Sequence, residues 1–369
     1  MAIKLAGYTE GWRIASIATQ VKTVQRILSV NHNALWHREE AWYLYPDRLR
    51  FPMEAQVRND EALNDFDVVE ILETGFCRPI YKATSRDNSL VVTTQCNCNC
   101  IMCPSPEASR KDGFAYSIKQ ICEIVNYIPE DAPHLTITGG EPTLLREGFF
   151  TLMDRLNKHL PNTDLLYLTN ARAFSNKRYA KCFNVLASNL TRIAIPFHAS
   201  NAYLHDHITQ VQGSFEQILT ACHYLAESKA QLEIRLVLSQ LNIDDINNLV
   251  EFLIRKIPRI TCVNYIALEM SGSAFMNRNV VWLDYRRAFQ EIKGSLLKLV
   301  TAGIDVNLYN FPLCAIEKGY RSIARASISD YKVRYSPECD ECGIKEICGG
   351  QFVSVLNGGF FQVRPIRIL

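Results

Sequence analysis

The chain has 369 residues, of which 48% are hydrophobic and 21% are charged. This composition is ordinary for soluble globular proteins, and the length suits a barrel with appendages. The 40 basic and 38 acidic residues nearly balance, which argues against a long nucleic-acid-binding track but leaves room for a local basic patch.

Two further signals bear on the compartment. No apolar run approaches the roughly 20 residues that span a bilayer. Residues 1–13 lack the apolar core of a signal peptide. We therefore expect a cytoplasmic protein with no membrane and no nucleic-acid partner. In that reducing compartment, the clustered cysteines among the 13 are expected to bind metal or do redox chemistry instead of forming disulfides.

Residues 1–85 carry short β-like runs, such as 41–44 and 67–72, and predict a small, mostly β N-terminal module. From there, short apolar runs alternate with helix-length amphipathic stretches. Strands are predicted at 89–93, 134–138, 165–169, 192–196, 233–238 and 264–268, with helices such as 117–127, 148–160, 213–227 and 243–256. Six β-then-α units predict a parallel sheet, either open and doubly wound or closed as a partial barrel, with ligands at the carboxyl ends of its strands.

The first cysteine cluster follows the first of these strands directly. Cys96, Cys100 and Cys103 form a CxxxCxxC pattern. A tight loop with this spacing can place three thiolates on three corners of an iron–sulfur cube and leave the fourth iron open to a small molecule. The alternative is zinc, but structural zinc takes four ligands in paired CxxC units, which would require Cys98 to join. We expect Cys98 to point away.

The second strand ends in the sequence Gly139-Gly140-Glu141-Pro142. Two glycines let the backbone pass close to a ligand, Glu141 offers a carboxylate to an ammonium group, and Pro142 stiffens the turn. Alone, this sequence is equally compatible with a plain strand-to-helix turn. Together with CxxxCxxC on the preceding strand, it resembles the radical S-adenosylmethionine (SAM) superfamily.

The resemblance implies a partial (β/α)6 barrel over residues 86–275, with one [4Fe–4S] cluster on Cys96, Cys100 and Cys103. SAM would bind the open iron, and the Gly139-Gly140-Glu141 turn would hold its methionyl amine. Cleavage of SAM by the reduced cluster would give a 5′-deoxyadenosyl radical that abstracts hydrogen from the substrate.

Three weaker matches extend the predicted SAM site. Asn170 ends the third strand in a sequence that resembles the family's Thr-Asn-Gly turn, although Ala171 replaces the glycine. Arg235 on the fifth strand has a guanidinium that fits the SAM carboxylate, or it forms an ordinary ion pair. His198 ends the fourth strand where many relatives carry Ser and Asp, so it is a ribose contact or, more commonly, a structural histidine.

The second cysteine cluster lies near the C-terminus. Cys339, Cys342 and Cys348 form CxxCx5C, which resembles the auxiliary-cluster signature of SPASM and twitch domains, and Cys314 stands where such domains often supply the first ligand. Four cysteines would saturate a second, auxiliary [4Fe–4S] cluster in a twitch-like region spanning residues 276–369. The alternative is a four-cysteine zinc knuckle.

A closer resemblance links the chain to the His-Xaa-Ser system radical SAM maturases (HxsC). It rests on residues 138–145, 168–174, 205–215, 268–272, 307–314, 325–331, 349–352 and 364–366. This kinship implies a peptide or small-protein substrate and a second radical SAM enzyme as a partner. We also expect an electron donor such as flavodoxin or ferredoxin.

Two alternatives remain open. A radical SAM enzyme can instead act on a sugar, nucleotide or amino acid, which a closed cavity would favour, whereas an open groove would favour a peptide. A zinc-binding interaction protein that has lost SAM chemistry would contain zinc in place of iron and sulfide.

Overall fold

The computed structural model describes residues 3–39, 41–52, 64–326 and 332–367. Part of the segment 325–331, which contributes to the family resemblance, lies outside these residues. The chain divides into two compact units. The first comprises residues 1–92, 116–137 and 147–165, and the second comprises residues 93–115, 138–146 and 166–369. No helix among the described residues is long and apolar enough to cross a membrane.

The first unit contains a seven-stranded sheet with the order β1-β7-β6-β2-β3-β4-β5. Only β2 and β3 pair in parallel, and the other neighbours are antiparallel. The core includes Ile17, Leu35 and Trp42, and helix α1 (Val21–Ser29) buries Val24 and Ile27 beside it. The strands are β1 (Ile3–Lys4), β2 (Arg13–Ala18), β3 (Ala34–Arg38), β4 (Ala41–Tyr45), β5 (Leu49–Pro52), β6 (Val68–Ile71) and β7 (Phe76–Tyr81).

A second sheet has its eight strands in sequence order, from β8 at one edge to β15 at the other. The pairs from β11 to β15 are parallel. The six predicted strands are present within a few residues, and β14 and β15 extend them. The strands are β8 (Ser89–Thr93), β9 (His134–Gly139), β10 (Asp164–Leu168), β11 (Thr191–Pro196), β12 (Gln231–Val237), β13 (Ile260–Ile266), β14 (Asp305–Tyr309) and β15 (Ala324–Arg325). The α/β fold with a curled parallel sheet, consistent with a partial barrel, is therefore confirmed.

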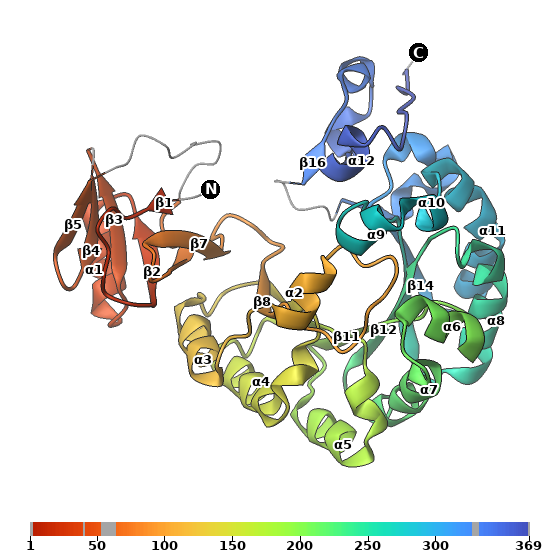
Figure 1. Cartoon of the computed structure of the whole chain (residues 1–369), viewed down its shortest axis with the longest axis horizontal. Helices are drawn as coiled ribbons and strands as arrows, with labels where there is room; N and C mark the ends of the chain where they lie inside the picture. The colour runs from red at the N-terminus through yellow and green to blue at the C-terminus, as the bar shows by residue number, and fades with distance from the viewer. Residues whose placement is uncertain (1–2, 40, 53–63, 327–331, 368–369) are drawn as a thin grey trace. The chain divides into compact units, whose positions relative to one another are not determined.

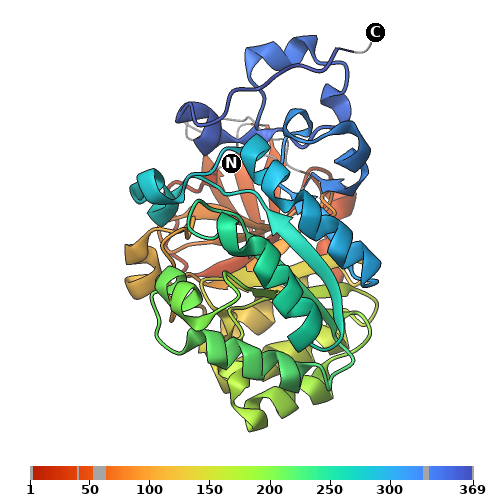
Figure 2. The same ribbon diagram turned by 90° about the vertical axis from the view of Figure 1, so that its right-hand side faces the viewer.

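Helices connect these strands. The first unit contains two of them, α3 (Ile118–Tyr127) and α4 (Glu147–His159). Helix α3 starts with a capping box between Ser117 and Gln120. The helices of the second unit are α2 (Glu107–Asp112), α5 (Lys177–Leu186), α6 (Ala202–Thr209), α7 (Ser214–Leu225), α8 (Ile246–Lys256), α9 (Gly272–Met276), α10 (Arg278–Val281), α11 (Tyr285–Thr301) and α12 (Val353–Asn357). Helices α8 and α11 lie side by side along the strands of this unit (Figures 1 and 2).

The two faces of β11 to β14 differ in polarity because side chains alternate along each strand. One face carries buried apolar side chains such as Ile195, Ile234 and Val263. Helix α11 packs on this face, where Tyr265 of β13 and Ser295 of α11 share a hydrogen bond of 2.6 Å. The register places polar side chains together on the opposite face, namely Arg192, Glu233, Arg235, Cys262, Asn264 and Asn307. Buried polar side chains need partners, so this inner face differs from an ordinary core.

The C-terminal region adds a two-stranded antiparallel sheet of β16 (Val333–Arg334) and β17 (Gln351–Phe352). Short 3₁₀ turns at Pro337–Glu341 and Lys345–Ile347 lie between its strands. The turns carry or border Cys339, Cys342 and Cys348. This region therefore presents its cysteines on short turns and not within long regular elements.

Candidate functional site

The first cysteine cluster lies in the loop between β8 and α2. Cys96, Cys100 and Cys103 are partly exposed, whereas Cys98 is buried. The Cys96 N–H donates to the Arg110 carbonyl at 2.9 Å, and the Cys103 N–H donates to the Cys100 carbonyl at 3.1 Å, so local backbone bonds shape the loop. The three predicted ligand thiols are thus partly accessible from one loop, while the buried Cys98 thiol stays in hydrogen-bond contact with Cys96 and Cys100 instead of pointing away from them.

Asn170 holds this loop from the end of β10. Its side-chain amide donates to Asn97 Oδ1 at 2.7 Å and to Cys98 Sγ at 3.4 Å. Arg172 adds a bond of 2.7 Å from its guanidinium to the Asn97 carbonyl. The sequence predicted Asn170 as a SAM contact, and its amide here fastens the cysteine loop to the neighbouring strand end. Arg172 was missed, because nothing in the sequence signals this long-range contact.

Two of these thiols have perturbed acidity. The hydrogen bond with Cys98 and burial both raise the pKa of the Cys96 thiol. The pKa of Cys98 is raised to about 12, mainly by its hydrogen bond with Cys100 and also by burial. The hydrogen bond with Cys96 acts in the opposite direction. Because metal ligands must be thiolates, metal loading at this loop would release protons.

The glycines of the Gly139-Gly140-Glu141 turn let it lie directly against the base of the cysteine loop. Gly140 N–H donates to the Thr93 carbonyl and Glu141 N–H to the Gln95 carbonyl, both at 2.8 Å. A Cβ atom on Gly139 would lie 2.0 Å from the Thr93 oxygen, and one on Gly140 would lie 2.1 Å from the Gln95 oxygen. The sequence assigned these glycines to close ligand approach, but close backbone packing already requires them.

Glu141 is fully buried, with no exposed side-chain surface. One carboxylate oxygen accepts bonds from the Thr143 N–H at 3.0 Å, the Thr143 hydroxyl at 2.6 Å and the Thr169 hydroxyl at 2.7 Å. The other accepts the Asn170 N–H at 2.6 Å. Burial raises the pKa of this carboxyl, and the four hydrogen bonds oppose that shift. The side chain therefore ties two strand ends together and does not face open space.

The contacts of Thr143 and Thr169 with the Glu141 carboxylate were not predicted from the sequence. Thr143 stands two residues after the carboxylate, a spacing typical of local side-chain-to-backbone turns, so it could have been found. Thr169 is brought in only by the sheet. Pro142 begins the 3₁₀ turn Pro142–Leu145 that Glu141 caps, as the stiffening role predicted.

Ala171, which replaces the family's glycine, has a left-handed backbone with φ of 60° and is fully buried. This conformation explains why glycine is common at this position, because a Cβ atom strains it by roughly 1–2 kcal/mol. The turn nevertheless forms, since the Ala171 N–H donates to the Thr169 hydroxyl at 3.0 Å. The departure from the family pattern therefore leaves the local geometry intact.

His198 lies at the end of β11 and is buried beside His205, with ring centroids 5.3 Å apart. Burial and the neighbouring His205 hold the pKa of His198 well below its usual value. Its Nδ1 atom has no hydrogen-bond partner among the described residues. The ring is thus a neutral, enclosed histidine.

Arg235 forms an ion pair on the inner face of the sheet. Its Nε atom donates to Glu233 at 2.7 Å, and its guanidinium lies 5.9 Å from the Tyr309 ring centroid. Arg192 approaches the same carboxylate at 3.8 Å. The ordinary ion pair that the sequence left open for Arg235 is therefore present.

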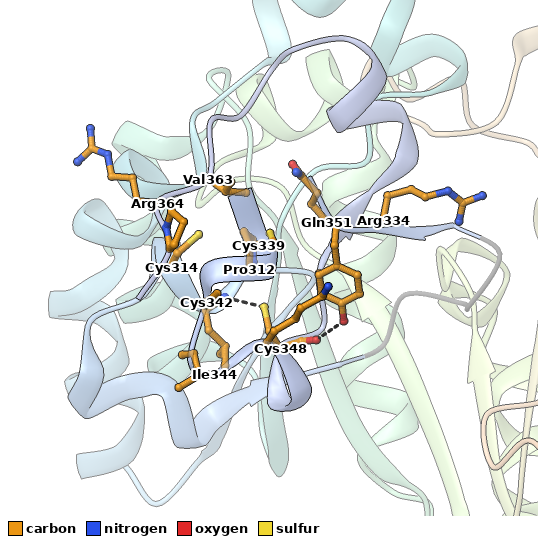
Figure 3. A pocket seen from close by; sticks show the side chains of 15 residues that line it. Pro312, Cys314, Arg334, Cys339, Cys342, Ile344, Cys348, Gln351, Val363 and Arg364 are labelled. Carbon is orange, nitrogen blue, oxygen red and sulfur yellow. Dashed lines mark hydrogen bonds between the residues drawn. The ribbon is translucent and has the colours of Figure 1, made fainter. Parts of the chain in front are cut away.

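The four C-terminal cysteines meet at one cavity. Cys314, Cys339, Cys342 and Cys348 all line it (Figure 3). The Leu313 N–H donates to Cys348 Sγ at 3.4 Å. Burial raises the pKa of the Cys314 thiol. The structure thus brings Cys314 to the same cavity as the three cysteines of the CxxCx5C pattern.

Within the described residues, no three His, Cys, Asp or Glu side chains converge in a way that would hold one metal ion. A cubane cluster does not require such convergence, because each thiolate ligates a different iron. The donor chemistry at both cysteine sets, soft sulfur on short turns and loops, fits an iron–sulfur cluster.

A second cavity of about 580 Å³ lies on the polar inner face, at the amino ends of β11 to β14. Glu233, Cys262 and Asn307 line it, together with Arg192 and Arg325. Asn307 donates to Cys262 Sγ at 3.2 Å and to Asn264 at 2.9 Å, so the wall is an ordered polar network. Its volume falls in the range of ligand pockets.

Comparison with protein families adds the decisive observation. Residues 90–253 match the family described as the Radical SAM superfamily. The matched residues make up less than half of the chain. The matched region runs from β8 into α8 and contains the first cysteine loop, the Gly139-Gly140-Glu141 turn, and Asn170, His198 and Arg235. Comparison with curated proteins finds no match.

Several solved structures share parts of this fold. Streptococcus suis SuiB bound to precursor peptide SuiA has a TM-score of 0.50 and 16% identity, covering 60% of this chain and 48% of that chain. Native anSMEcpe with bound AdoMet gives 0.47 and 18%, covering 60% and 63%. A radical SAM methyltransferase from Sphaerobacter thermophilus gives 0.43 and 14%, covering 73% and 71%. At such identities the likeness concerns the fold, and the matched region spans about half of SuiB.

Proposed function

We propose that the chain is a radical SAM enzyme that abstracts a hydrogen atom from a peptide or small protein as part of a post-translational modification. The observation that carries the proposal is the set of three partly exposed thiols in the loop after β8, inside the region that matches the Radical SAM superfamily. A [4Fe–4S] cluster with SAM on its open iron supplies the reductive cleavage that generates the 5′-deoxyadenosyl radical.

The residues of the chain then have distinct roles in this proposal. Cys96, Cys100 and Cys103 would hold the cluster, and the Gly139-Gly140-Glu141 turn would hold the methionyl amine. Glu141 acts as a positioning residue, because its four hydrogen bonds fix the two strand ends on which those contacts depend. Asn170 acts in the same way on the cysteine loop.

The C-terminal cavity is proposed to hold an auxiliary [4Fe–4S] cluster in a twitch-like region. Four cysteines around one cavity would ligate every iron of a cube, so this cluster would transfer electrons and would have no open iron for a substrate. A four-cysteine zinc site remains the alternative that metal analysis distinguishes.

A peptide substrate is supported by the fold shared with SuiB, whose structure holds a precursor peptide. The resemblance to the HxsC maturases supports the same substrate class, and with it a second radical SAM enzyme and a flavodoxin or ferredoxin as partners. The 580 Å³ cavity does not favour the small-molecule alternative, because it lies at the amino ends of the strands, away from the cysteine loop and the Gly139-Gly140-Glu141 turn at their carboxyl ends.

The first experiment is anaerobic reconstitution, followed by counting of iron and sulfide and by measurement of 5′-deoxyadenosine after addition of dithionite and SAM. The test variant replaces Cys96, Cys100 and Cys103 with Ala, and the matched control is Cys98→Ala in the same loop. We expect about eight irons per chain in the wild type and about four in the triple variant. 5′-Deoxyadenosine should form in the wild type and the control alone. Zinc in place of iron would overturn the proposal.

The substrate class is tested with the loaded enzyme and two fractions of a cell extract, one of peptides and one of small metabolites. A peptide substrate predicts that the peptide fraction stimulates 5′-deoxyadenosine formation and that protease treatment removes the stimulation. Stimulation by the metabolite fraction, insensitive to protease, would establish the small-molecule alternative.

A further inference from the structure

Arg110 of α2 is a buried cation that forms no direct ion pair with any of the described residues. Its side chain is only 3% exposed. The guanidinium donates to three neutral acceptors, which are the Ser105 carbonyl, the Asn99 side-chain oxygen and, at 2.9 Å, the Ser273 hydroxyl. Its Nε atom has no hydrogen-bond partner among the described residues. The site therefore encloses a positive charge that the described protein groups solvate but do not neutralise.

The main partner of Glu107 is Lys111, which lowers the pKa of this carboxyl most, and the attraction of Arg110 helps to lower it. Glu107 forms an ion pair with Lys111 at 2.7 Å and accepts a bond from Asn99 at 3.2 Å, and it lies on the exposed side of α2. Asn99 thus separates this carboxylate from the guanidinium. Enclosing a charge without a direct counter-ion is unfavourable, so the retention of Arg110 at this place points to an anion that binds there.

The three acceptors of Arg110 place its guanidinium against the cluster loop. Asn99 immediately precedes Cys100, and Ser105 follows Cys103 by two residues, so the guanidinium bridges both ends of the segment that carries these two thiols. The backbone carbonyl of Arg110 accepts the Cys96 N–H. Arg110 consequently contacts the loop beside all three predicted ligands.

Helix α9 closes the other side of this arrangement. Its Ala274 N–H donates to the Cys103 carbonyl at 3.0 Å, and Ser273 supplies the third acceptor of Arg110. A Cβ atom on Gly272 would lie 2.4 Å from the Pro104 carbonyl oxygen, so the helix touches the loop backbone directly. These contacts hold the guanidinium in a fixed place, with water excluded from most of its surface.

We infer that Arg110 is a positioning residue that offsets the negative charge of the iron–sulfur cluster on Cys96, Cys100 and Cys103. The inference rests on the proposed function. One-electron reduction adds a negative charge to the cluster, and a fixed cation nearby stabilises the reduced form more than the oxidised form. Net charge and hydrogen bonds around a cluster set its reduction potential. Arg110 therefore raises that potential and makes the cluster easier to reduce.

The test uses the full chain in a Cys339→Ala/Cys342→Ala background, so that the first cluster is observed alone. Arg110→Met removes the charge and the hydrogen bonds, Arg110→Gln removes the charge and keeps a donor, and Arg110→Lys keeps the charge and loses the planar fork. The control is Arg178→Met, an exposed arginine on α5. Iron content and the reduction potential, from an EPR-monitored titration, are measured for each reconstituted protein.

We expect Arg110→Met and Arg110→Gln to shift the potential to more negative values, while Arg110→Lys and Arg178→Met stay near the parent value. If Arg110→Lys alone retains iron, the charge is needed to hold the cluster and the inference stands. Loaded Arg110→Met with the parent potential would overturn it, and so would equal loss of iron in the Met, Gln and Lys variants, because the role would then be mechanical. A parent protein that binds no iron would contradict the proposed function itself.

Discussion

The carboxylate of Glu141, at the end of β9, accepts the backbone N–H of Asn170, just beyond β10, at 2.6 Å. The bond joins the turn that follows one strand to the turn that follows the next. Because the Asn170 side chain also holds Asn97 and Cys98, a single buried acid is connected through one residue to the cysteine loop. The geometry of the proposed cluster site thus depends on a residue that has no exposed surface.

Replacement of Glu141 by Gln tests this connection. The amide that replaces one carboxylate oxygen is a donor and leaves at least one of the four buried donors without an acceptor, which should cost about 2 kcal/mol or more. Urea titration measures the free energy of unfolding. The control is Glu130→Gln, because Glu130 is exposed. An unchanged unfolding midpoint for Glu141→Gln would show that the buried network is not structurally important.

Gly140→Ala tests the packing of the turn against the cysteine loop. The added Cβ atom would lie 2.1 Å from the Gln95 oxygen and 2.4 Å from the Thr94 oxygen, so the loop must move. We expect a loss of about 1–3 kcal/mol in unfolding free energy and a reduced iron content after reconstitution. Gly319→Ala is the matched control, because nothing lies within 4 Å of its added Cβ atom. Equal behaviour of the two variants would contradict the packing argument.

The C-terminal cavity predicts a separable metal site. Cys339→Ala/Cys342→Ala should lower the iron content from about eight to about four per chain and leave dithionite-driven formation of 5′-deoxyadenosine in place, because the first loop is untouched. Cys182→Ala on α5, outside both cysteine sets, is the control. Iron that stays at the wild-type level, or a loss of zinc in place of iron, would argue against an auxiliary cluster.

Stability should fall in mild acid because of His205. Burial, opposed by nearby Asp206, lowers the pKa of His205 to about 4 in the folded chain, below the ordinary value of 6.5. Between pH 4 and pH 6.5, His205 binds a proton more readily in the unfolded chain than in the folded chain. The stability that neutral His205 contributes is therefore complete above pH 6.5 and is lost as the pH falls toward 4. The loss amounts to about 3 kcal/mol.

His205→Gln should flatten the unfolding free energy measured between pH 7 and pH 4.5, whereas His207→Gln, an exposed histidine on the same helix, should keep the wild-type slope. Buried His198 lies beside His205, and its pKa is lowered by burial as well, so some acid sensitivity is expected to remain in the variant. Identical slopes for both variants would assign the sensitivity to other groups.

Local pattern in the sequence was sufficient to predict the strands, the parallel sheet and the cysteine loop. Apolar runs of strand length between amphipathic helices leave few topologies, and β8 begins and ends at the predicted residues. The CxxxCxxC spacing carries its own geometric meaning because all three thiols belong to one short loop. The same holds for CxxCx5C near the C-terminus.

The tertiary structure decided what the neighbouring segments do to those motifs. The sequence predicts Glu141 as part of the SAM site, and the fold in addition bonds its carboxylate to Thr143, Thr169 and Asn170, of which only the sheet brings the last two to it. Contacts between distant segments likewise bring Cys314 to the same cavity as Cys339, Cys342 and Cys348. They also place Ser273 beside Arg110. Residue spacing determines which groups share a loop, whereas burial and long-range packing determine which of them face a cofactor and which hold the others in place.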